Sequence, residues 1–518
     1  MRTAISSALR TNGRHVTREA SLLMPSGGPT KTYLAFDFGA ESGRATLAHL
    51  HAGVITTEEV HRFANEPVFY GGSLHWDVPR LWWEVGRALE KLDKTKLEGV
   101  GVDAWGVDYA LLGDGGELLG NPYHYRDRRT NGVMEQVFQI VAKEEIYRMT
   151  GIQFMPINTL YQLFAAKQKT PRIVEAAEGL LAIPDLFHYW LTGNAVCEST
   201  NASTTQMLDA ATRNWAADLL ERLGLPPELP SRIVEPGSVI GTLLPEVARG
   251  RFLSGTPVIA PASHDTGSAV AAITARDGTA FLSSGTWSLI GVELDAPLVT
   301  PESFKLNFTN EGGVNGTTRF LKNVMGLWML QRCRQSWAAR GDEFGYPELW
   351  ELAEKESPFR CLVDPDDETF LCPDDMPLAI DEFCEKTHQP SPSCPGAYAR
   401  AILESLALRY RVVLKNIECL TGQQIRQIRV IGGGSKNDLL NQFTADATGR
   451  KLLAGPAEAT ALGNAGMQML ATGEAGSLLE VREIIDRSFP TKAFEPHQTD
   501  AWDRQAERFQ QYCECIYA

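Results

Sequence analysis

The sequence lacks two features that would point to membranes or nucleic acids. No run of about 18 consecutive apolar residues occurs in it, so a membrane span is not expected. Positive charge is also in deficit, because 49 Lys and Arg stand against 64 Asp and Glu, a formal net charge of −15. Neither nucleic acid nor a membrane surface is therefore expected as a partner. An anionic substrate would be repelled at long range by this net charge. Metal ions, arginine side chains and backbone N–H groups would therefore have to make the electrostatic potential positive at its binding site.

Cysteine is scarce and scattered. Nine cysteines occur in 518 residues, and their spacing matches neither a zinc site nor a small disulfide scaffold. The odd number and wide spacing favour reduced thiols in a cytoplasmic protein. A metal or redox pair formed by Cys513 and Cys515 is the less favoured alternative.

The N-terminal 30 residues are set apart by composition. They carry four arginines against one acid, Glu19, and show no apolar periodicity. A transit peptide has this composition, but an N-terminal extension, or a working start at Met24, is the favoured interpretation. We expect residues 1–30 to be disordered and order to begin near Lys31. The remaining length and the 43% hydrophobic content allow two or more domains.

The stretch YLAFDFGAESGRATLAHL organises the first half of the chain. Apolar runs over residues 33–38 and 45–50 flank a polar glycine turn, which predicts two antiparallel strands. The turn is a candidate phosphate cradle, with a hydroxyl from Ser42, a positive fork from Arg44 and a metal-binding carboxylate from Asp37. An ordinary β-hairpin with a glycine turn remains the alternative.

A second stretch of the same design follows in the second half. Residues 279–294, TAFLSSGTWSLIGVEL, again read as strand, small polar turn and strand. Two such units far apart in the chain predict two related domains that face one nucleotide across a cleft.

Two further strand ends carry carboxylates. PVIAPASHDTGSAV reads as a strand followed by a small-residue helix, with Asp265 either an N-cap or a base that takes a proton from a sugar hydroxyl. GVDAWGVDYALL turns on Gly106 between Asp103 and Asp108. A hydrolytic acid–base pair is disfavoured there. Hydrogen bonds to substrate hydroxyls, or loop solvation, are the favoured roles of these two acids.

Several other segments have weaker patterns. Salt bridges are expected among the charged residues 126–129. A polar loop is expected at Asn201–Gln206. Residues 133–163 and 172–191 should be largely helical, with breaks at Pro156 and Pro184. A strand near 425–431, a GGGS turn and a helix near 438–447 place backbone N–H groups at an anion or a purine. This turn matches neither a dinucleotide fingerprint nor a Walker A loop.

Taken together, these stretches resemble the FGGY carbohydrate kinases of the actin-like, hexokinase-like superfamily. The blocks that carry the resemblance span roughly residues 32–490 and are DFGAESGR, GVDAWGVDYALL, YRDRRTNG, GIQFMPINTLYQL, NASTTQ, SHDTGSAV, LSSGTWSL, NEGG, LKNVMGLWMLQ and GGGSKN. The resemblance implies an α/β fold with two RNase H-like domains around a central nucleotide and sugar cleft. The implied limits are 31–273 for the N-terminal domain, 274–490 for the C-terminal domain and 491–518 for a tail.

The resemblance also implies roles for individual residues. ATP would be held by Ala40, Glu41, Ser42, Gly43, Arg44, Thr286, Gln331 and Gly433, with Mg²⁺ near Asp37. The sugar would be held by Gly106, His264, Asp265, Thr266 and Asn323. With Asp265 as proton acceptor for the 1-hydroxyl of L-rhamnulose, the products would be L-rhamnulose 1-phosphate and ADP, as in L-rhamnose catabolism.

Alternatives and departures remain at this stage. The ketose could instead be L-fuculose or xylulose, and an ATP-binding regulator without a sugar site is a hypothesis of another class. The expected partners are a ketose and ATP, in a monomer or homodimer. Many relatives have serine where Glu41 stands. The carboxylate of Glu41 would face a phosphate unless the side chain turns outward or pairs with a cation. A disulfide possible in some relatives is not expected, because Ala401 stands at the position that would pair with Cys384.

Overall fold

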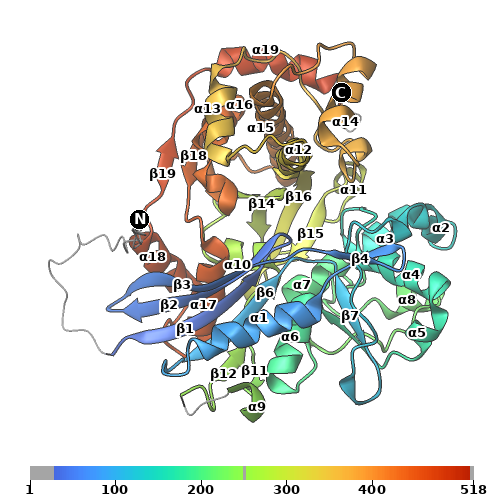
Figure 1. Ribbon diagram of the computed structural model, residues 1–518, viewed down its shortest axis with the longest axis vertical. Helices are drawn as coiled ribbons and strands as arrows, with labels where there is room; N and C mark the ends of the chain where they lie inside the picture. The colour runs from blue at the N-terminus through green and yellow to red at the C-terminus, as the bar shows by residue number, and fades with distance from the viewer. Residues whose placement is uncertain (1–28, 249–251, 514–518) are drawn as a thin grey trace, which may run out of the picture.

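Two α/β bodies make up the molecule, one above the other in Figure 1. The computed structural model describes residues 29–248 and 252–513. The lower body is built on a six-stranded sheet with the order β11-β12-β6-β1-β2-β3. Its strands are β1 Lys31–Phe38, β2 Ser42–His51, β3 Val54–Ala64, β6 Gly99–Ala104, β11 Val239–Thr242 and β12 Pro257–Ile259. The first predicted hairpin is confirmed, because β1 and β2 pair antiparallel with a turn between them.

The central strand of this sheet is buried on both faces. Every residue of β1 after Lys31 is buried, as expected for a strand with parallel and antiparallel neighbours and helices on each side. Helix α6 (Ile183–Thr192) packs on β6, and α1 (Val78–Glu90) packs on β3. Asp77 caps α1 by accepting a hydrogen bond from the backbone N–H of Arg80.

The upper body is built on a seven-stranded sheet with the order β15-β16-β14-β13-β17-β18-β19. Its strands are β13 Thr279–Ser284, β14 Trp287–Leu294, β15 Thr309–Gly312, β16 Thr318–Met325, β17 Gln427–Ile431, β18 Lys451–Ala454 and β19 Lys492–Phe494. The second predicted hairpin is confirmed by the antiparallel pairing of β13 with β14. Helix α15 (Pro395–Thr421) forms the core of this body.

One helix of the second half packs on the sheet of the first. Helix α17 (Ala459–Ala471) contacts β1, β6 and the short helix α10 (Asp265–Ala271), and in Figure 1 its red ribbon lies beside the blue strands. The approach of the two helices is close, because a Cβ on Gly463 would lie 1.7 Å from the carbonyl oxygen of Ser268. Small residues of α17 and α10 therefore pack closely against each other and join the second half of the chain to the first sheet.

The structure corrects parts of the predicted helical segments in the first half. Residues 133–163 divide into α2 (Val133–Phe138), α3 (Lys143–Thr150) and α4 (Thr159–Lys169). The segment 172–191 contains α5 (Pro171–Glu175) and then a strand, β8 (Gly179–Ala182), which pairs with β7 (Tyr109–Leu112). Pro184 does not break a helix but lies in the first turn of α6, where its missing N–H costs nothing.

The segment Asn201–Gln206 is not the exposed polar loop that its composition suggests. Residues 199–202 form α7 (Ser199–Ala202) and residues 203–205 a 3₁₀ turn, and all of them are buried. Their hydroxyls are satisfied locally, as when Thr204 Oγ1 donates to the carbonyl oxygen of Asn201 at 2.8 Å.

Several helices of the second half contact α15, and others pack on the first sheet. The helices are α11 Pro301–Lys305, α12 Trp328–Ala339, α13 Tyr346–Lys355, α14 Met376–Lys386, α16 Asp438–Thr448, α18 Leu478–Ser488 and α19 Thr499–Gln510. Residues after 490 add β19 to the sheet edge, and α19 buries Trp502 and Phe509 in the same core. The domain limits themselves stay a prediction, and both residues 1–28 and Cys515 lie outside the described residues.

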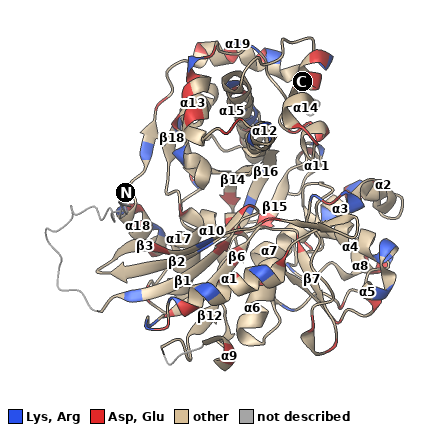
Figure 2. Cartoon of the chain, viewed as in Figure 1, with Lys and Arg blue, Asp and Glu red and all other residues tan. Residues whose placement is uncertain are grey.

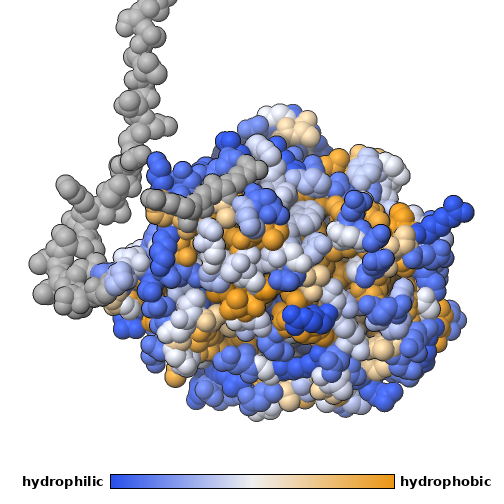
Figure 3. Space-filling view, turned by 90° about the horizontal axis from the view of Figure 1, so that it is seen from below, coloured by the Kyte–Doolittle hydropathy of each residue, from blue (hydrophilic) through white to orange (hydrophobic). Residues whose placement is uncertain are grey.

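The surface is mixed in charge and polarity. Lys and Arg alternate with Asp and Glu over both bodies (Figure 2), and Figure 3 shows apolar patches scattered among hydrophilic side chains on the face seen from below. Among the described helices, none is both long enough and apolar enough to pass through a bilayer.

Candidate active site

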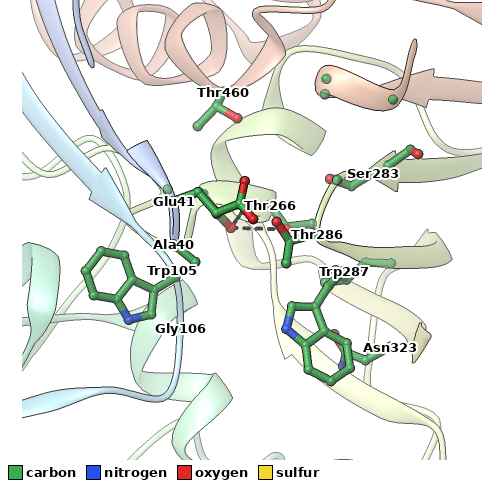
Figure 4. Close-up of a pocket in the computed structure, with 18 of the residues that line it drawn as sticks. Ala40, Glu41, Trp105, Gly106, Thr266, Ser283, Thr286, Trp287, Asn323 and Thr460 are labelled. Atoms are coloured by element: carbon green, nitrogen blue, oxygen red, sulfur yellow. Dashed lines mark hydrogen bonds between the residues drawn. The ribbon is translucent and has the colours of Figure 1, made fainter. Parts of the chain in front are cut away.

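A cleft of about 620 Å³ lies between the two sheets. Its walls are the turns of the two hairpins, the loop after β6, the start of α10, the end of β16 and the glycine turn after β17. Figure 4 shows Ala40, Glu41 and Gly106 on one side, and Ser283, Thr286 and Asn323 on the other. The two predicted glycine and hydroxyl turns therefore face each other across one cavity.

Nearly all of the predicted site residues line this cleft. Those that do are Asp37, Ala40, Glu41, Ser42, Arg44, Gly106, His264, Asp265, Thr266, Thr286, Asn323, Gln331 and Gly433. Gly43 is the exception: it lies in β2 outside the lining, and the ring of Phe63 comes within 2.3 Å of where its Cβ would be. Packing against Phe63, rather than access to a phosphate, accounts for a glycine there.

Three neighbouring strand ends bring the candidate base to the first hairpin. Phe38 pairs with Ala104 of β6, and Ala104 in turn forms a parallel bridge with His264. Asp37 and Asp265 consequently lie at the same edge of the first sheet, at the floor of the cleft. This arrangement follows from the strand order β12-β6-β1.

Asp265 is the first residue of α10 but not its N-cap. The N-cap position belongs to His264, and the Asp265 carboxylate accepts from the backbone N–H of Thr266, with Oδ1 2.5 Å from the nitrogen. Burial raises the pKa of Asp265 above its ordinary value, and the charge of Asp37 adds to this, while His264 and Thr266 oppose it. A raised pKa makes this carboxylate a better proton acceptor.

The guanidinium of Arg44 forms ion pairs with two carboxylates. Its Nε and Nη2 donate to Oδ2 of Asp37 at 2.9 and 2.7 Å, and its Nη1 pairs with Glu458 at the start of α17. Burial lowers the pKa of Arg44, but the charges of Asp37 and Glu458 outweigh it and the net shift is upward. Arg44 therefore fixes Asp37, whereas the sequence had suggested a free fork for phosphate.

Asn65, which no sequence motif singled out, stabilises the first turn. Asn65 donates through Nδ2 to the carbonyl oxygen of Gly39 at 2.9 Å, and its own backbone N–H donates to the carbonyl oxygen of Glu41 at 2.9 Å. The side chain of Asn65 is 3% exposed, so the brace is shielded from water. It holds the backbone of the turn in one conformation.

Asp103 and Asp108 are buried, which contradicts the expected roles in substrate contact or loop solvation. Neither lines the cleft. Asp108 accepts from the indole N–H groups of Trp76 and Trp105 at 2.5 and 2.9 Å, and burial raises its pKa to about 6. Asp103 accepts from Asn464 Nδ2 of α17 at 2.5 Å. Both acids are therefore structural.

Gly106 approaches the segment behind it closely. A Cβ there would lie 2.9 Å from Oγ1 of Thr204, and the same hydroxyl accepts from the backbone N–H of Val107 at 3.1 Å. Val107 has φ of 67°, a conformation that β-branched residues rarely adopt. The buried 199–206 segment therefore supports the loop by which Gly106 and Val107 line the cleft.

The charged cluster 126–129 does not form the expected mutual salt bridges. Arg126 donates to the carbonyl oxygen of Leu371 at 2.6 Å and stacks on Trp328. Asp127 accepts from backbone N–H groups, including that of Arg129 at 2.9 Å. The cluster instead ties the first domain to the second, and Arg128 adds an exposed ion pair with Asp374.

Residues of the second body complete the cleft wall opposite the first hairpin turn. Gln331 of α12 donates to Thr286 Oγ1 at 3.3 Å and to Glu41 Oε2 at 3.1 Å. Desolvation between the cleft walls raises the pKa of Glu41, while the positive charges of Arg334 and Arg126 oppose this shift. The GGGS turn packs on β13, because a Cβ on Gly434 would overlap Ser284 Oγ at 2.0 Å.

Asn323 lies in β16, two residues before its end. Gln153, which follows α3, accepts at Oε1 from the Asn323 backbone N–H at 2.9 Å and from Nδ2 at 3.2 Å. Gln153 and Glu311 both line the cleft, and the sequence blocks that contain them did not identify either as a site residue. A bidentate contact of this kind fixes which way the Asn323 amide faces.

Comparisons with known proteins agree with this geometry. The model of the N-terminal domain of the FGGY family of carbohydrate kinases matches residues 32–272, and that of the C-terminal domain matches residues 280–472. A rhamnulokinase from Bacteroides thetaiotaomicron is 47% identical over 476 residues, 91% of this chain and 97% of the relative. One from Pectobacterium atrosepticum is 43% identical, covering 93% and 96%, and one from Bacillus subtilis is 40% identical, covering 90% and 96%.

Solved structures agree with the fold. A gluconate kinase from Lactobacillus acidophilus superposes with a TM-score of 0.76 at 18% identity and covers 94% of this chain and 97% of its own. A ligand-bound xylulose kinase from the same organism has a TM-score of 0.75 at 19% identity and covers 93% and 97%. At these identities the likeness speaks for the fold alone, and the two-domain cleft architecture expected from the sequence is confirmed.

Proposed function

The chain belongs to the FGGY family of carbohydrate kinases, and from this we propose that it transfers the γ-phosphoryl group of ATP to the 1-hydroxyl of L-rhamnulose. The products are L-rhamnulose 1-phosphate and ADP. The choice of ketose is supported by relatives named rhamnulokinase at 40 to 47% identity over nine-tenths of the chain. The site residues given below are part of the same proposal.

One observation carries the catalytic part of the proposal. The carboxylate of Asp265 opens into the cleft, with 32% of its side chain exposed, at the sheet edge from which the first hairpin turn projects. A hydroxyl at this carboxylate and a phosphoryl group above the turn can meet in line. Polar groups for the sugar come from the loop at Gly106, from His264 and Thr266, and from Asn323.

Asp265 acts as the general base. It takes the proton of the 1-hydroxyl as the oxygen bonds to the γ-phosphorus, and the bond from that phosphorus to the β–γ bridging oxygen breaks to release ADP. Ala40, Glu41, Ser42 and Arg44 form one wall beside the triphosphate, and Thr286, Gln331 and Gly433 the other. Two walls that exclude water also suppress hydrolysis of ATP.

The donor set fits a Mg²⁺ that arrives with ATP. Asp37 presents a carboxylate to the cleft, 6% exposed and held by Arg44. Within residues 29–248 and 252–513 no cluster of three or more His, Cys, Asp or Glu side chains forms a metal site. Mg²⁺ commonly binds through one or two carboxylates plus substrate phosphates, so Asp37 would hold it jointly with the nucleotide. There it would neutralise charge on the triphosphate.

A coupled ADP-release assay over a panel of ketoses tests the proposal. We expect ADP release to depend on the sugar, with the highest kcat/KM for L-rhamnulose over L-fuculose and xylulose. A preference for another ketose would change the proposed substrate but leave the proposed kinase activity intact. ATP turnover that no sugar changes would contradict the kinase function and favour an ATP-binding regulator. The cytoplasmic location and the monomeric or homodimeric state are also proposals.

A further inference from the structure

A buried ion pair of the second sheet reaches the histidine next to the candidate base. Glu311 of β15 and Arg319 of β16 lie directly opposite each other in the antiparallel ladder. Their side chains are 5% and 0% exposed, and Arg319 Nη1 lies 3.3 Å from Glu311 Oε2. Arg319 is held further by its Nε, which donates to the carbonyl oxygen of Gly312 at 2.8 Å.

Both members of the pair approach one ring nitrogen of His264. Nη2 of Arg319 lies 3.1 Å from Nδ1, and Oε2 of Glu311 lies 3.3 Å from the same nitrogen. The other ring nitrogen, Nε2, lies 3.5 Å from Oδ1 of Asp265. His264 thus bridges a pair of charges on one sheet and the candidate base on the other.

A guanidinium can only donate, and this constrains the tautomer of His264. If Arg319 Nη2 donates to Nδ1, then Nδ1 carries no proton and the neutral ring must carry it on Nε2. The alternative is a proton on Nδ1 that is donated to Glu311. The geometry favours donation by Arg319, because its Nη2 lies 3.1 Å from Nδ1, closer than Oε2 of Glu311 at 3.3 Å.

We propose that Arg319 and Glu311 are positioning residues that hold His264 in its Nε2–H tautomer, with that N–H turned toward Asp265 and the sugar. Arg319 sets the proton by donating to Nδ1. Glu311 balances the buried guanidinium, since a buried charge without a partner would be costly. An Nε2–H beside Asp265 stabilises the ionised carboxylate and can donate to a sugar oxygen that binds next to the pair. The proposal rests on the assignment of Asp265 as base in the proposed kinase.

The backbone on either side of His264 is fixed independently, so the pair acts on the ring rather than on the chain. Glu198, which is fully buried, accepts from the backbone N–H of Ser263 at 2.8 Å and from its hydroxyl at 2.8 Å. The backbone N–H of His264 donates to Thr200 Oγ1 at 3.3 Å. Loss of the ion pair should therefore leave the loop in place while the imidazole loses its constraint.

The test is the ¹⁵N long-range spectrum of the full chain labelled at histidine, recorded without substrate. The His264 resonances are identified by their loss in His264→Gln. We expect an unprotonated Nδ1 and a protonated Nε2 in the parent protein. The double variant Arg319→Leu/Glu311→Leu, which removes both charges together, should lose this pattern. Its kcat should fall by about 10²-fold with the KM for ATP unchanged, as for misplacement of a catalytic group.

The matched control is Arg482→Leu/Glu293→Leu. This is another buried Arg–Glu pair of the second half, with Nη2 2.9 Å from both carboxylate oxygens, and it does not line the cleft. It should keep the His264 pattern and kcat. If the Arg319→Leu/Glu311→Leu protein does not fold, the parent spectrum alone decides, because it reports directly which ring nitrogen of His264 carries the proton.

A proton on Nδ1 in the parent spectrum would overturn the proposal, as would unchanged kcat and an unchanged pattern in the Arg319→Leu/Glu311→Leu variant. Failure of the proposed function is seen separately. It would appear as absence of sugar-dependent ADP release by the parent protein, whereas the spectrum needs neither sugar nor ATP.

Discussion

The amide of Gln331 in the second domain donates a hydrogen bond to the carboxylate of Glu41 in the first, with Nε2 3.1 Å from Oε2. This contact crosses the cleft. The same amide nitrogen lies 3.3 Å from Thr286 Oγ1. In the proposed ATP site, the carboxylate of Glu41 is therefore hydrogen-bonded to a neutral donor.

Replacing Glu41 by serine should strengthen ATP binding. The substitution removes a negative charge beside the triphosphate, and a like charge several ångströms away in a solvated cleft costs about 0.7 kcal/mol. We expect the KM for ATP to fall about threefold with little change in kcat, and the gain to shrink at high ionic strength. Glu41→Gln, which removes the charge but keeps the shape, should behave alike. A higher KM for ATP in both variants would show that the acid helps binding.

Replacing Asp37 by asparagine should raise the requirement for Mg²⁺. The amide oxygen is a weaker ligand than a carboxylate, and Arg44 loses one of its two charged partners. We expect the Mg²⁺ concentration for half-maximal rate to rise about tenfold, or 1.4 kcal/mol. Glu458→Gln perturbs Arg44 from the other side and should leave the Mg²⁺ requirement unchanged. Equal shifts in both variants would assign the effect to Arg44 instead.

His124 should make the fold sensitive to acid. Burial, with help from the charge of Arg126, lowers its pKa to about 3, whereas in the unfolded chain the pKa is about 6.5. Between these values the unfolded state binds a proton that the folded state does not, so stability is present above pH 6.5 and is lost as the pH falls toward 3. The loss is about 1.4 kcal/mol per pH unit, or about 2 kcal/mol from pH 6.5 to 5.

Urea unfolding at pH 7 and pH 5 checks this prediction. His124→Asn keeps an acceptor for the backbone N–H of Arg126, which now donates to Nδ1 at 3.0 Å. It should lose about 2 kcal/mol less than the parent protein on this shift of pH. His388→Asn, at an exposed position, should match the parent. Equal losses in the His124→Asn variant and the parent would refute the assignment.

Asp108 should be needed for folding and not for chemistry. Its carboxylate accepts from two indole groups, from the Gln162 amide and from the backbone N–H of Tyr125. Asp108→Ala leaves these buried donors without partners and should lower the free energy of unfolding by about 3 to 5 kcal/mol. Asp93→Ala, at an exposed position, should change it by less than about 0.5 kcal/mol. A stable Asp108→Ala protein with no kinase activity would instead return this acid to the active site.

The sequence predicted the elements whose signals are local. Both hairpins have alternating apolar strands around glycine turns, and the strand before Asp265 ends in small residues that begin a helix, so these features could be found without a structure. What could not be found depends on contacts between distant segments. Because α17 packs on the first sheet, Asp103 accepts a hydrogen bond from Asn464, and the indole of Trp76, far from Asp108 in the sequence, helps to bury that acid.

The cleft residues also divide into those that local motifs predict and those that only tertiary contacts place there. Residues inside the ordered motifs, such as Asp265 and Thr286, were predicted because of the turns that hold them. Glu311 and Gln153 lie in the blocks NEGG and GIQFMPINTLYQL, but nothing in these blocks distinguished them, and only the structure shows their contacts with the other domain. Side-chain partners across a cleft are set by tertiary geometry, which neither periodicity nor spacing encodes.

The central claim is that Asp265 removes the proton from the sugar hydroxyl, and Asp265→Asn tests it most directly. Asparagine has nearly the same shape but cannot accept that proton. In sugar-dependent ADP release with L-rhamnulose, we predict that kcat falls by about 10² to 10⁴-fold, while the KM for ATP and the thermal unfolding midpoint change little. A variant that retains kcat within about tenfold of the parent would contradict the general-base role.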